Sequence, residues 1–161
     1  MKIDKINCQI LNLLQENCRM SLTKISKKIG LSVDSTKKRM DKLQENGLFF
    51  PKIQIRPRSF GYHNIIDVKI KIQNYEEKRI KEFIDYCIKN PRIAELFSIS
   101  GEWNFTLVLI AKDYKDQAEI TNKIRTEFGD IIGSWSESLT TTAYKFEKYD
   151  ILKLEGYEDV Y

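Results

Sequence analysis

The chain has few of the residues on which disulfide scaffolds, metal sites and histidine-based catalysis depend. Its 161 residues include only three cysteines and one histidine. Cys8, Cys18 and Cys87 are odd in number, lie far apart and form no C-x-x-C pair, so we expect reduced thiols and no zinc site. The lone His63 excludes a His-rich metal site and is expected to be structural. We therefore predict neither a metal nor a cofactor.

Long apolar runs are also missing. No stretch approaches the roughly 18 uninterrupted apolar residues that a membrane span requires. The N-terminal sequence MKIDKINCQIL lacks the apolar core of a signal peptide. We therefore expect a cytoplasmic protein without a membrane partner. The 42% apolar and 31% charged residues suit one or two small packed domains.

Residues 21–46 carry the most informative pattern that is present. Apolar residues repeat at helical spacing before Gly30, which follows the small Ser26 by four residues and can take the positive φ that ends a helix. Ser32 is a good N-cap for a second helix. The inward face of that helix is expected to hold Thr36, Met40 and Leu43. This spacing is typical of a helix-turn-helix, whose second helix enters a DNA major groove.

The outward face of the second helix indicates which residues meet DNA. A 3.6-residue period turns Asp34 and Lys38 outward, and short polar or cationic side chains in the first turns suit base edges and phosphates. A solvated charged face would have a similar composition, but the complete spacing favours DNA. The predicted DNA-binding residues are Ser32, Asp34, Ser35, Lys37, Lys38 and Arg39, the last near flanking phosphates, with Lys24 and Lys27 from the preceding helix.

The charge of the chain is unevenly distributed. Residues 1–66 hold thirteen Lys and Arg against five Asp and Glu, a net charge of +8. Residues 67–161 hold fourteen against eighteen, a net charge of −4. This asymmetry is expected when one part of a protein meets phosphate and the other does not, and it predicts DNA binding with steep salt dependence. The alternative is a chance imbalance of surface charge.

The order of elements predicts an α+β protein with two domains. A first helix at about 4–16, capped by Asp4, completes a three-helix helix-turn-helix domain over residues 1–50. Residues 51–62 contain two of the three prolines and are interpreted as a linker. Residues 63–150 are expected to form a βαββαβ, ferredoxin-like domain, followed by a C-terminal tail at 151–161. Its strands are predicted at about 65–73, 93–100, 103–112 and 131–148, and its helices at 76–90 and 114–128.

Two helices cover one face of such a sheet and leave the other bare. We expect the bare face to carry Ile66, Val68, Thr106, Val108 or their neighbours. An apolar face of this size needs a partner, most simply the same face of a second subunit.

This architecture closely resembles the leucine-responsive and asparagine-related (Lrp/AsnC, feast/famine) transcription regulators. Two segments carry the resemblance, IDKINCQILNLLQENCRMSLTKISKKIGLSVDSTKKRMDKLQENGL and LFSISGEWNFTLVLIAKD. It implies a sequence-specific regulator of double-stranded DNA whose C-terminal RAM-type domains form a homodimer, often assembled into tetramers or octamers. It also implies control by a small molecule, usually an amino acid, bound between dimers.

The resemblance also implies where that effector would bind. Carried over by position, the effector-binding residues are Gly101, Glu102, Trp103 and Asn104, which would face Leu139, Thr140 and Thr141. The chain departs from the family in having Asn104 where Asp is common and Trp103 in place of Tyr or Phe. An asparagine cannot pair with an ammonium group by charge, and the tryptophan adds volume that can fill the pocket. A purely structural turn is therefore the alternative.

Two other functions compete with specific regulation. An architectural DNA-binding protein of low sequence specificity would share the basic N-terminal part. A tetrapyrrole decarboxylase of the same architecture would need a cluster of His, Tyr and Arg, and this sequence has no such cluster. We therefore predict a protein that is not an enzyme.

Overall fold

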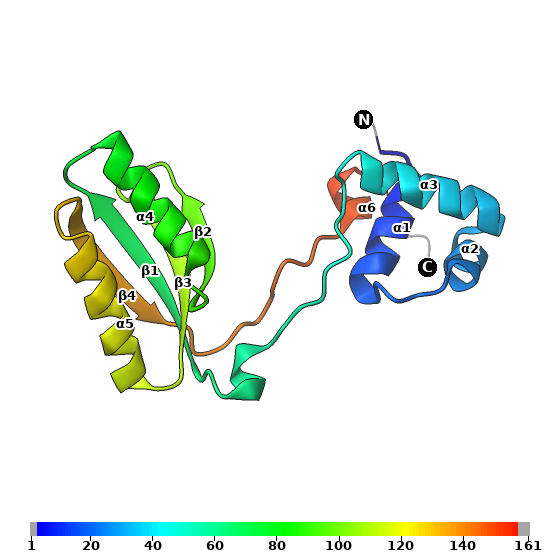
Figure 1. Cartoon of the computed structure of the whole chain (residues 1–161). Coiled ribbons are helices and arrows are strands. Elements are labelled where there is room, and N and C mark those ends of the chain that lie inside the picture. Colours follow the sequence, from blue (N-terminus) through cyan, green and yellow to red (C-terminus); the bar gives the residue numbers. More distant parts are fainter. Residues whose placement is uncertain (1–2, 158–161) are drawn as a thin grey trace. The chain divides into compact units, whose positions relative to one another are not determined.

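The computed structural model describes residues 3–157, and the chain folds into two units (Figure 1). Unit 1 contains the residues up to Gln54 together with those from Tyr144 onward. Unit 2 spans Ile55–Ala143. No helix among the described residues is long and apolar enough to cross a membrane.

Unit 1 is helical. It contains α1 (Lys5–Glu16), α2 (Leu22–Ile29), α3 (Val33–Glu45) and the short α6 (Ile151–Leu154). The first three match the helices expected from apolar spacing, and the Asp4 side chain caps α1 by accepting the Asn7 N–H at 2.8 Å. Six buried apolar side chains form the core: Ile10, Leu11, Leu13, Ile25, Ile29 and Leu43.

The C-terminal end of the chain lies in a different place from the one predicted. The sequence assigned residues 144–150 to the sheet domain and residues 151–161 to a separate tail. In the structure the described part of this segment belongs to unit 1, where α6 packs on α1. A four-residue helix has too few apolar positions to show a helical period, so no local pattern indicates it.

Unit 2 is a four-stranded antiparallel sheet with two helices. The elements are the 3-10 helix η1 (Pro57–Phe60), β1 (Asn64–Ile72), α4 (Glu77–Lys89), β2 (Ile93–Ser98), β3 (Phe105–Ala111), α5 (Tyr114–Glu127) and β4 (Ile132–Leu139). The strand order β2-β3-β1-β4 confirms the predicted ferredoxin-like arrangement. It also places β3 in the interior of the sheet, as its apolar residues on both faces required.

The fourth strand is shorter than predicted. Residues after Leu139 keep an alternating pattern, which extended the expected strand to about residue 148. The ladder instead ends where Leu139 pairs with Ile66 and the Thr140 N–H reaches the Ile65 carbonyl. Beyond this point β1 offers almost no further residues, because it begins at Asn64.

Two residues lie on the opposite face of the sheet from the one predicted. Ile66 and Val68 are fully buried in the core with Phe83 of α4 and Ile124 of α5, so they lie on the helix-covered face and not on the bare one. The bare face carries their alternate neighbours, since side chains alternate along a strand. These are Ile65, Asp67, Lys69, Thr106, Val108 and Ile110, with Glu95 and Phe97 from β2.

The helix α4 buries Ile80, Phe83 and Cys87 against the sheet, whereas its neighbouring apolar residue Ile88 is 70% exposed. A residue directly after an inward-facing one is turned by about 100° on a helix, which carries Ile88 past the edge of the core.

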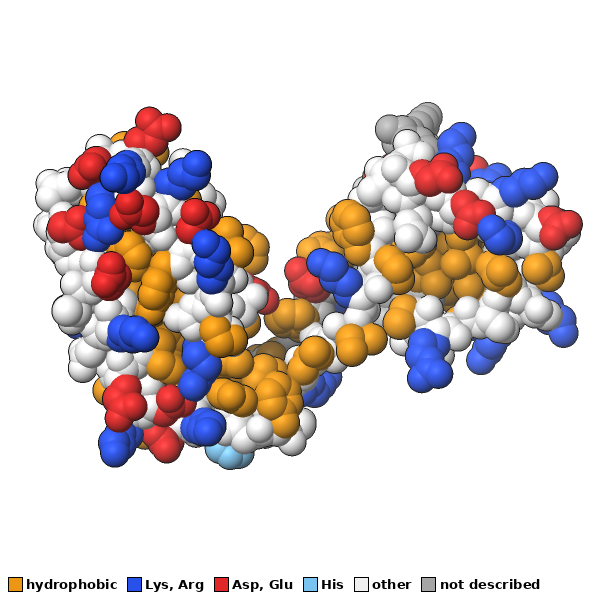
Figure 2. All heavy atoms as spheres, viewed as in Figure 1, with side chains coloured by type: hydrophobic (Ala, Val, Ile, Leu, Met, Phe, Trp, Pro, Cys, Tyr) orange, Lys and Arg blue, Asp and Glu red, His pale blue; other side chains and the backbone are white. Residues whose placement is uncertain are grey.

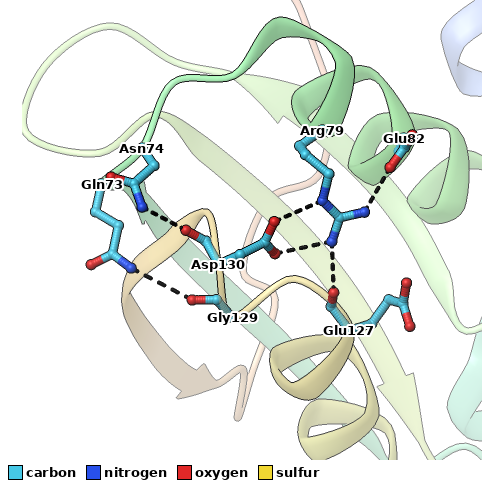
Figure 3. A network of polar contacts seen from close by, with 7 residues as sticks. All are labelled: Gln73, Asn74, Arg79, Glu82, Glu127, Gly129 and Asp130. Atoms are coloured by element: carbon cyan, nitrogen blue, oxygen red, sulfur yellow. Dashed lines mark hydrogen bonds and ion pairs between the residues drawn. The ribbon is translucent and has the colours of Figure 1, made fainter.

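A polar network fixes the turn between α5 and β4 to α4 (Figure 3). The Arg79 guanidinium binds both carboxylate oxygens of Asp130, at 2.7 and 2.9 Å, and also donates to Glu82 and to the Glu127 carbonyl. Asn74 donates to the Asp130 carbonyl at 2.8 Å. Bidentate pairs of this kind are geometrically specific. The network therefore sets where β4 begins.

Candidate functional site

The turn between α2 and α3 is built as the sequence predicted. Gly30 adopts φ 70° and ψ 30°, the left-handed conformation that ends α2. Ser26 is buried, and its hydroxyl donates to the Thr23 carbonyl of the same helix at 3.0 Å. Ser32 caps α3 by accepting the Ser35 N–H at 3.2 Å. The start of α3 is thus held in one position relative to α2.

The first turns of α3 present their polar side chains to solvent. Thr36 and Leu43 are fully buried, which turns Asp34, Ser35 and Lys38 outward. Within residues 3–157 the structure gives Lys38 no hydrogen bond or ion pair. Its ammonium group is available to a phosphate.

Three of the predicted residues, Ser32, Ser35 and Lys37, already have partners within the chain. Ser32 and Ser35 hydrogen-bond through their hydroxyls at 2.9 Å, and Lys37 pairs with Asp41 at 2.5 Å. The Lys37 and Asp41 side chains are 60% and 51% exposed, so the pair is weak and Lys37 can exchange it for a phosphate.

The Arg39 side chain, predicted near flanking phosphates, is already bound within unit 1. Its guanidinium crosses to α1, where it donates to the Asp4 carboxylate at 2.6 Å and to the Asn7 side-chain carbonyl at 2.9 Å. Burial by itself raises the pKa of Asp4, but the hydrogen bonds from Arg39 and the Asn7 N–H outweigh it and hold that pKa below its usual value. Arg39 therefore ties α3 to α1. Asp4 lies 35 positions away, which no local pattern could reveal.

The preceding helix adds exposed cations. Lys24 and Lys27 of α2 are exposed, as predicted, and so is Lys28, which the sequence reasoning did not include. In Figure 2, Lys and Arg side chains project from the part of unit 1 that α2 and α3 form. The resulting surface is suited to a polyanion.

The turn between β2 and β3 is held to the sheet by Asn104. Its N–H donates to the Ile70 carbonyl at 2.9 Å, and its side-chain carbonyl accepts the Ile72 N–H at 2.8 Å. Gly101 has φ 134°, a conformation that L side chains rarely adopt. Trp103 is half-buried and Glu102 is exposed. The carbonyl of the Asn104 side chain is thus engaged, and its NH2 group is the part that can donate a hydrogen bond to a ligand.

The structure does not bring the two halves of the predicted effector site together within one chain. Asn104 contacts β1 at Ile70 and Ile72, whereas Leu139 pairs with Ile66. Six residues along a strand separate Ile66 from Ile72, or about 20 Å. A site that uses both halves needs a second copy of the chain.

The other half of that site has its own fixed geometry. The Arg58 guanidinium donates to the carbonyls of Thr140 and Thr141 and to the His63 carbonyl. The Thr140 hydroxyl donates to Asp67. These bonds hold the chain where it leaves β4. Among the described residues, no group of three or more His, Cys, Asp or Glu is placed to hold a metal ion.

Two family models match the chain, one on each unit. The AsnC-type helix-turn-helix domain matches residues 3–44, and the Lrp/AsnC ligand binding domain matches residues 66–130. The chain is 30% identical to the HTH-type transcriptional regulator LrpA of Pyrococcus horikoshii over 128 residues, which are 76% of this chain and 86% of that one. It is 24% identical to the DNA-binding transcriptional activator DecR of Escherichia coli K12, over 76% of this chain and 81% of that one.

Solved structures share the fold. The transcriptional regulator NMB0573 of Neisseria meningitidis, in complex with L-Met, aligns with a TM-score of 0.84 at 18% identity, over 95% of this chain and 99% of that one. AsnC of E. coli aligns with a TM-score of 0.79 at 19% identity, over 93% and 99%.

Proposed function

Because the chain belongs to the Lrp/AsnC family of DNA-binding transcriptional regulators, we propose that it reads DNA with the first turns of α3, as a cytoplasmic oligomer with an even number of copies. One observation carries this proposal most directly. The start of α3 is fixed by the Ser32 cap and by buried Thr36, while Asp34, Ser35 and Lys38 remain exposed. A recognition helix needs this combination of a rigid backbone and available side chains.

The exposed residues divide into two roles. Asp34 and Ser35 have short side chains in the first turn, where a major-groove helix approaches base edges, and would contribute to sequence reading. Lys37, Lys38 and the lysines of α2 would neutralise phosphates and set affinity and salt dependence. Arg39 has a positioning role, since it is engaged with α1.

The bare sheet face of unit 2 would form the contact between copies. Val108, Thr106 and Ile110 supply apolar area on β3, and Phe97 beside them is 52% exposed. The same face on a second copy would cover them in an isologous interface. A two-fold dimer would then present two α3 helices to half-sites about one DNA turn apart.

We also propose an amino-acid effector at the interface between dimers. The neighbour NMB0573 was solved in complex with L-Met. In this chain the Asn104 amide would donate to a carboxylate, and the exposed Glu102 would replace the charge that the family's usual Asp supplies to an ammonium group. Residues Leu139–Thr141 of another copy would complete the pocket, because one chain holds the two halves about 20 Å apart.

Selection of bound fragments from genomic DNA tests the regulatory function. The wild-type chain is expected to enrich a limited set of sequences, with an affinity at fixed salt at least about a thousandfold above that for random DNA. A ratio near one would support the architectural alternative instead and contradict specific regulation.

A further inference from the structure

Two amide side chains of α1 bind the C-terminal segment of the chain through hydrogen bonds. The Gln15 amide makes a reciprocal pair with the backbone of Tyr149, since it donates to the carbonyl and accepts the N–H, both at 2.8 Å. Asn12 donates to the Asp150 carboxylate at 3.0 Å and accepts the Ile151 N–H at 2.9 Å. Residues 12 and 15 lie on one face of a helix, so together they recognise three consecutive residues.

Apolar burial accompanies these hydrogen bonds. Leu152 is only 1% exposed, and Ile151 packs against the core of unit 1. Asp150 also caps α6, and the Tyr157 hydroxyl donates to the Ile3 carbonyl at 3.4 Å. A helix of four residues has no stability of its own. Its order therefore comes from docking on α1.

The helix that receives the C-terminal segment also holds the recognition helix. The N-cap Asp4 and Asn7 of α1 bind Arg39 of α3, and Asn12 and Gln15 bind the segment further along the same helix. We propose that residues 149–157, the C-terminal clasp, are a working part of the DNA-binding unit. The clasp fixes α1, and α1 in turn fixes α3, so that DNA binding depends on the far end of the chain.

The clasp gives β4 a direct covalent path to the DNA-binding unit. Residues 140–148 run from the end of β4 to the clasp and contain no helix or strand. Their first two carbonyls are held by Arg58. The DNA-binding unit is thus joined to unit 2 twice, through residues near 55 and through this return segment.

A charge exchange in the full chain tests the clasp. Asn12→Asp places a second carboxylate against Asp150, whereas Asp150→Asn alone keeps an N-cap of equal quality. The double variant exchanges acid and amide and restores the contact. Gln9→Ala is the matched control, because Gln9 lies on α1 and makes no side-chain hydrogen bond in the structure of residues 3–157. Hydrogen exchange of the α1 amides and affinity for a DNA fragment selected by the wild-type chain are measured.

We expect Asn12→Asp to speed exchange in α1 and to weaken DNA binding, each by about tenfold, as when a part-buried hydrogen bond becomes a repulsion. The double variant should recover both, and Gln9→Ala should change neither. The two tryptophans, Trp103 and Trp135, lie in unit 2, so their fluorescence transition in denaturant should not move. An Asn12→Asp chain with faster α1 exchange but wild-type DNA affinity would overturn the proposal, as would a double variant without recovery.

Discussion

Lys38 and Arg39 are adjacent cations for which we predict different effects on DNA binding. Lys38 has no partner in the structure of residues 3–157, and Arg39 is bound to α1. Each alanine substitution removes one positive charge. If charge alone mattered, the two variants would behave alike. We predict instead that Lys38→Ala changes the salt dependence of binding and that Arg39→Ala changes the stability of unit 1.

The magnitudes follow from the two environments. Each phosphate contact contributes about 0.9 to the slope of log affinity against log salt concentration. When salt is raised from 50 to 200 mM, a variant that lacks one contact should therefore lose about 3.5-fold less affinity than the wild type. A dimer that loses two contacts would lose about 1.8 from the slope. The Arg39 and Asp4 side chains are 35% and 53% exposed, so solvent screens the pair. With the Asn7 hydrogen bond, its loss would cost about 1–2 kcal/mol of unfolding free energy.

The assay is a salt titration of DNA affinity, combined with urea unfolding followed by far-UV circular dichroism. Lys81→Ala is the charge-matched control, because Lys81 is exposed on α4 in unit 2. It should change neither the slope nor the unfolding of unit 1. Equal slopes for wild type and Lys38→Ala would refute the placement of Lys38 at a phosphate. A reduced slope with full stability for Arg39→Ala would refute its positioning role.

Three further predictions concern unit 2. Val108→Asp puts a carboxylate on the bare face between its cross-strand neighbours Asp67 and Glu95, so sedimentation velocity should show a shift towards monomer; an unchanged oligomer would place the contact elsewhere. An amino-acid effector at about a hundredfold its dissociation constant should stabilise the folded chain by about 2.7 kcal/mol per site. Thermal shift and light scattering with each of the twenty amino acids would detect this. No response in either assay would mean that the chain has no amino-acid sensor. Hydrogen bonds from Arg79 hold the pKa of Asp130 below its usual value, so their stabilisation is complete above about pH 4 and is lost as pH falls through the lowered pKa. Asp130→Asn should therefore flatten the acid side of the stability curve followed by tryptophan fluorescence, and an identical acid transition in wild type and variant would contradict this.

Local patterns were sufficient for the helices α1 to α5, for the presence of the four strands and for the turn of the DNA-binding motif. Gly30, Ser32 and Thr36 each act within a few residues, through backbone conformation, capping and helical period, so their roles are visible in sequence. The alternation along β1 likewise predicted a strand. It did not fix which set of residues faces the helices, because Ile66 and Val68 could be assigned only once their partners in α4 and α5 were known.

The features that sequence could not supply depend on contacts between distant residues. Arg39 carries the positive charge expected of a phosphate contact. Only the position of Asp4 in the fold shows that its guanidinium binds at α1. The end of β4 is set by where β1 begins. In the clasp, the side-chain amides of Gln15 and Asn12 bind backbone groups of Tyr149 and Ile151. Every residue has such backbone groups, so these contacts leave no pattern in the sequence.

The clasp also has a consequence for folding during synthesis, because the clasp and the helix that receives it are made at very different times. Asn12 and Ile151 lie 139 positions apart, so a ribosome working at about 5–20 residues per second makes the receiving helix roughly 7–28 seconds before the segment that docks on it. All of unit 2 is therefore synthesised before α1 can make its contacts with residues 149–157. Closing so long a loop is entropically costly and favours a late folding step. On this proposal the DNA-binding unit would reach its full affinity for DNA only after residues 149–157 have been synthesised and docked on α1.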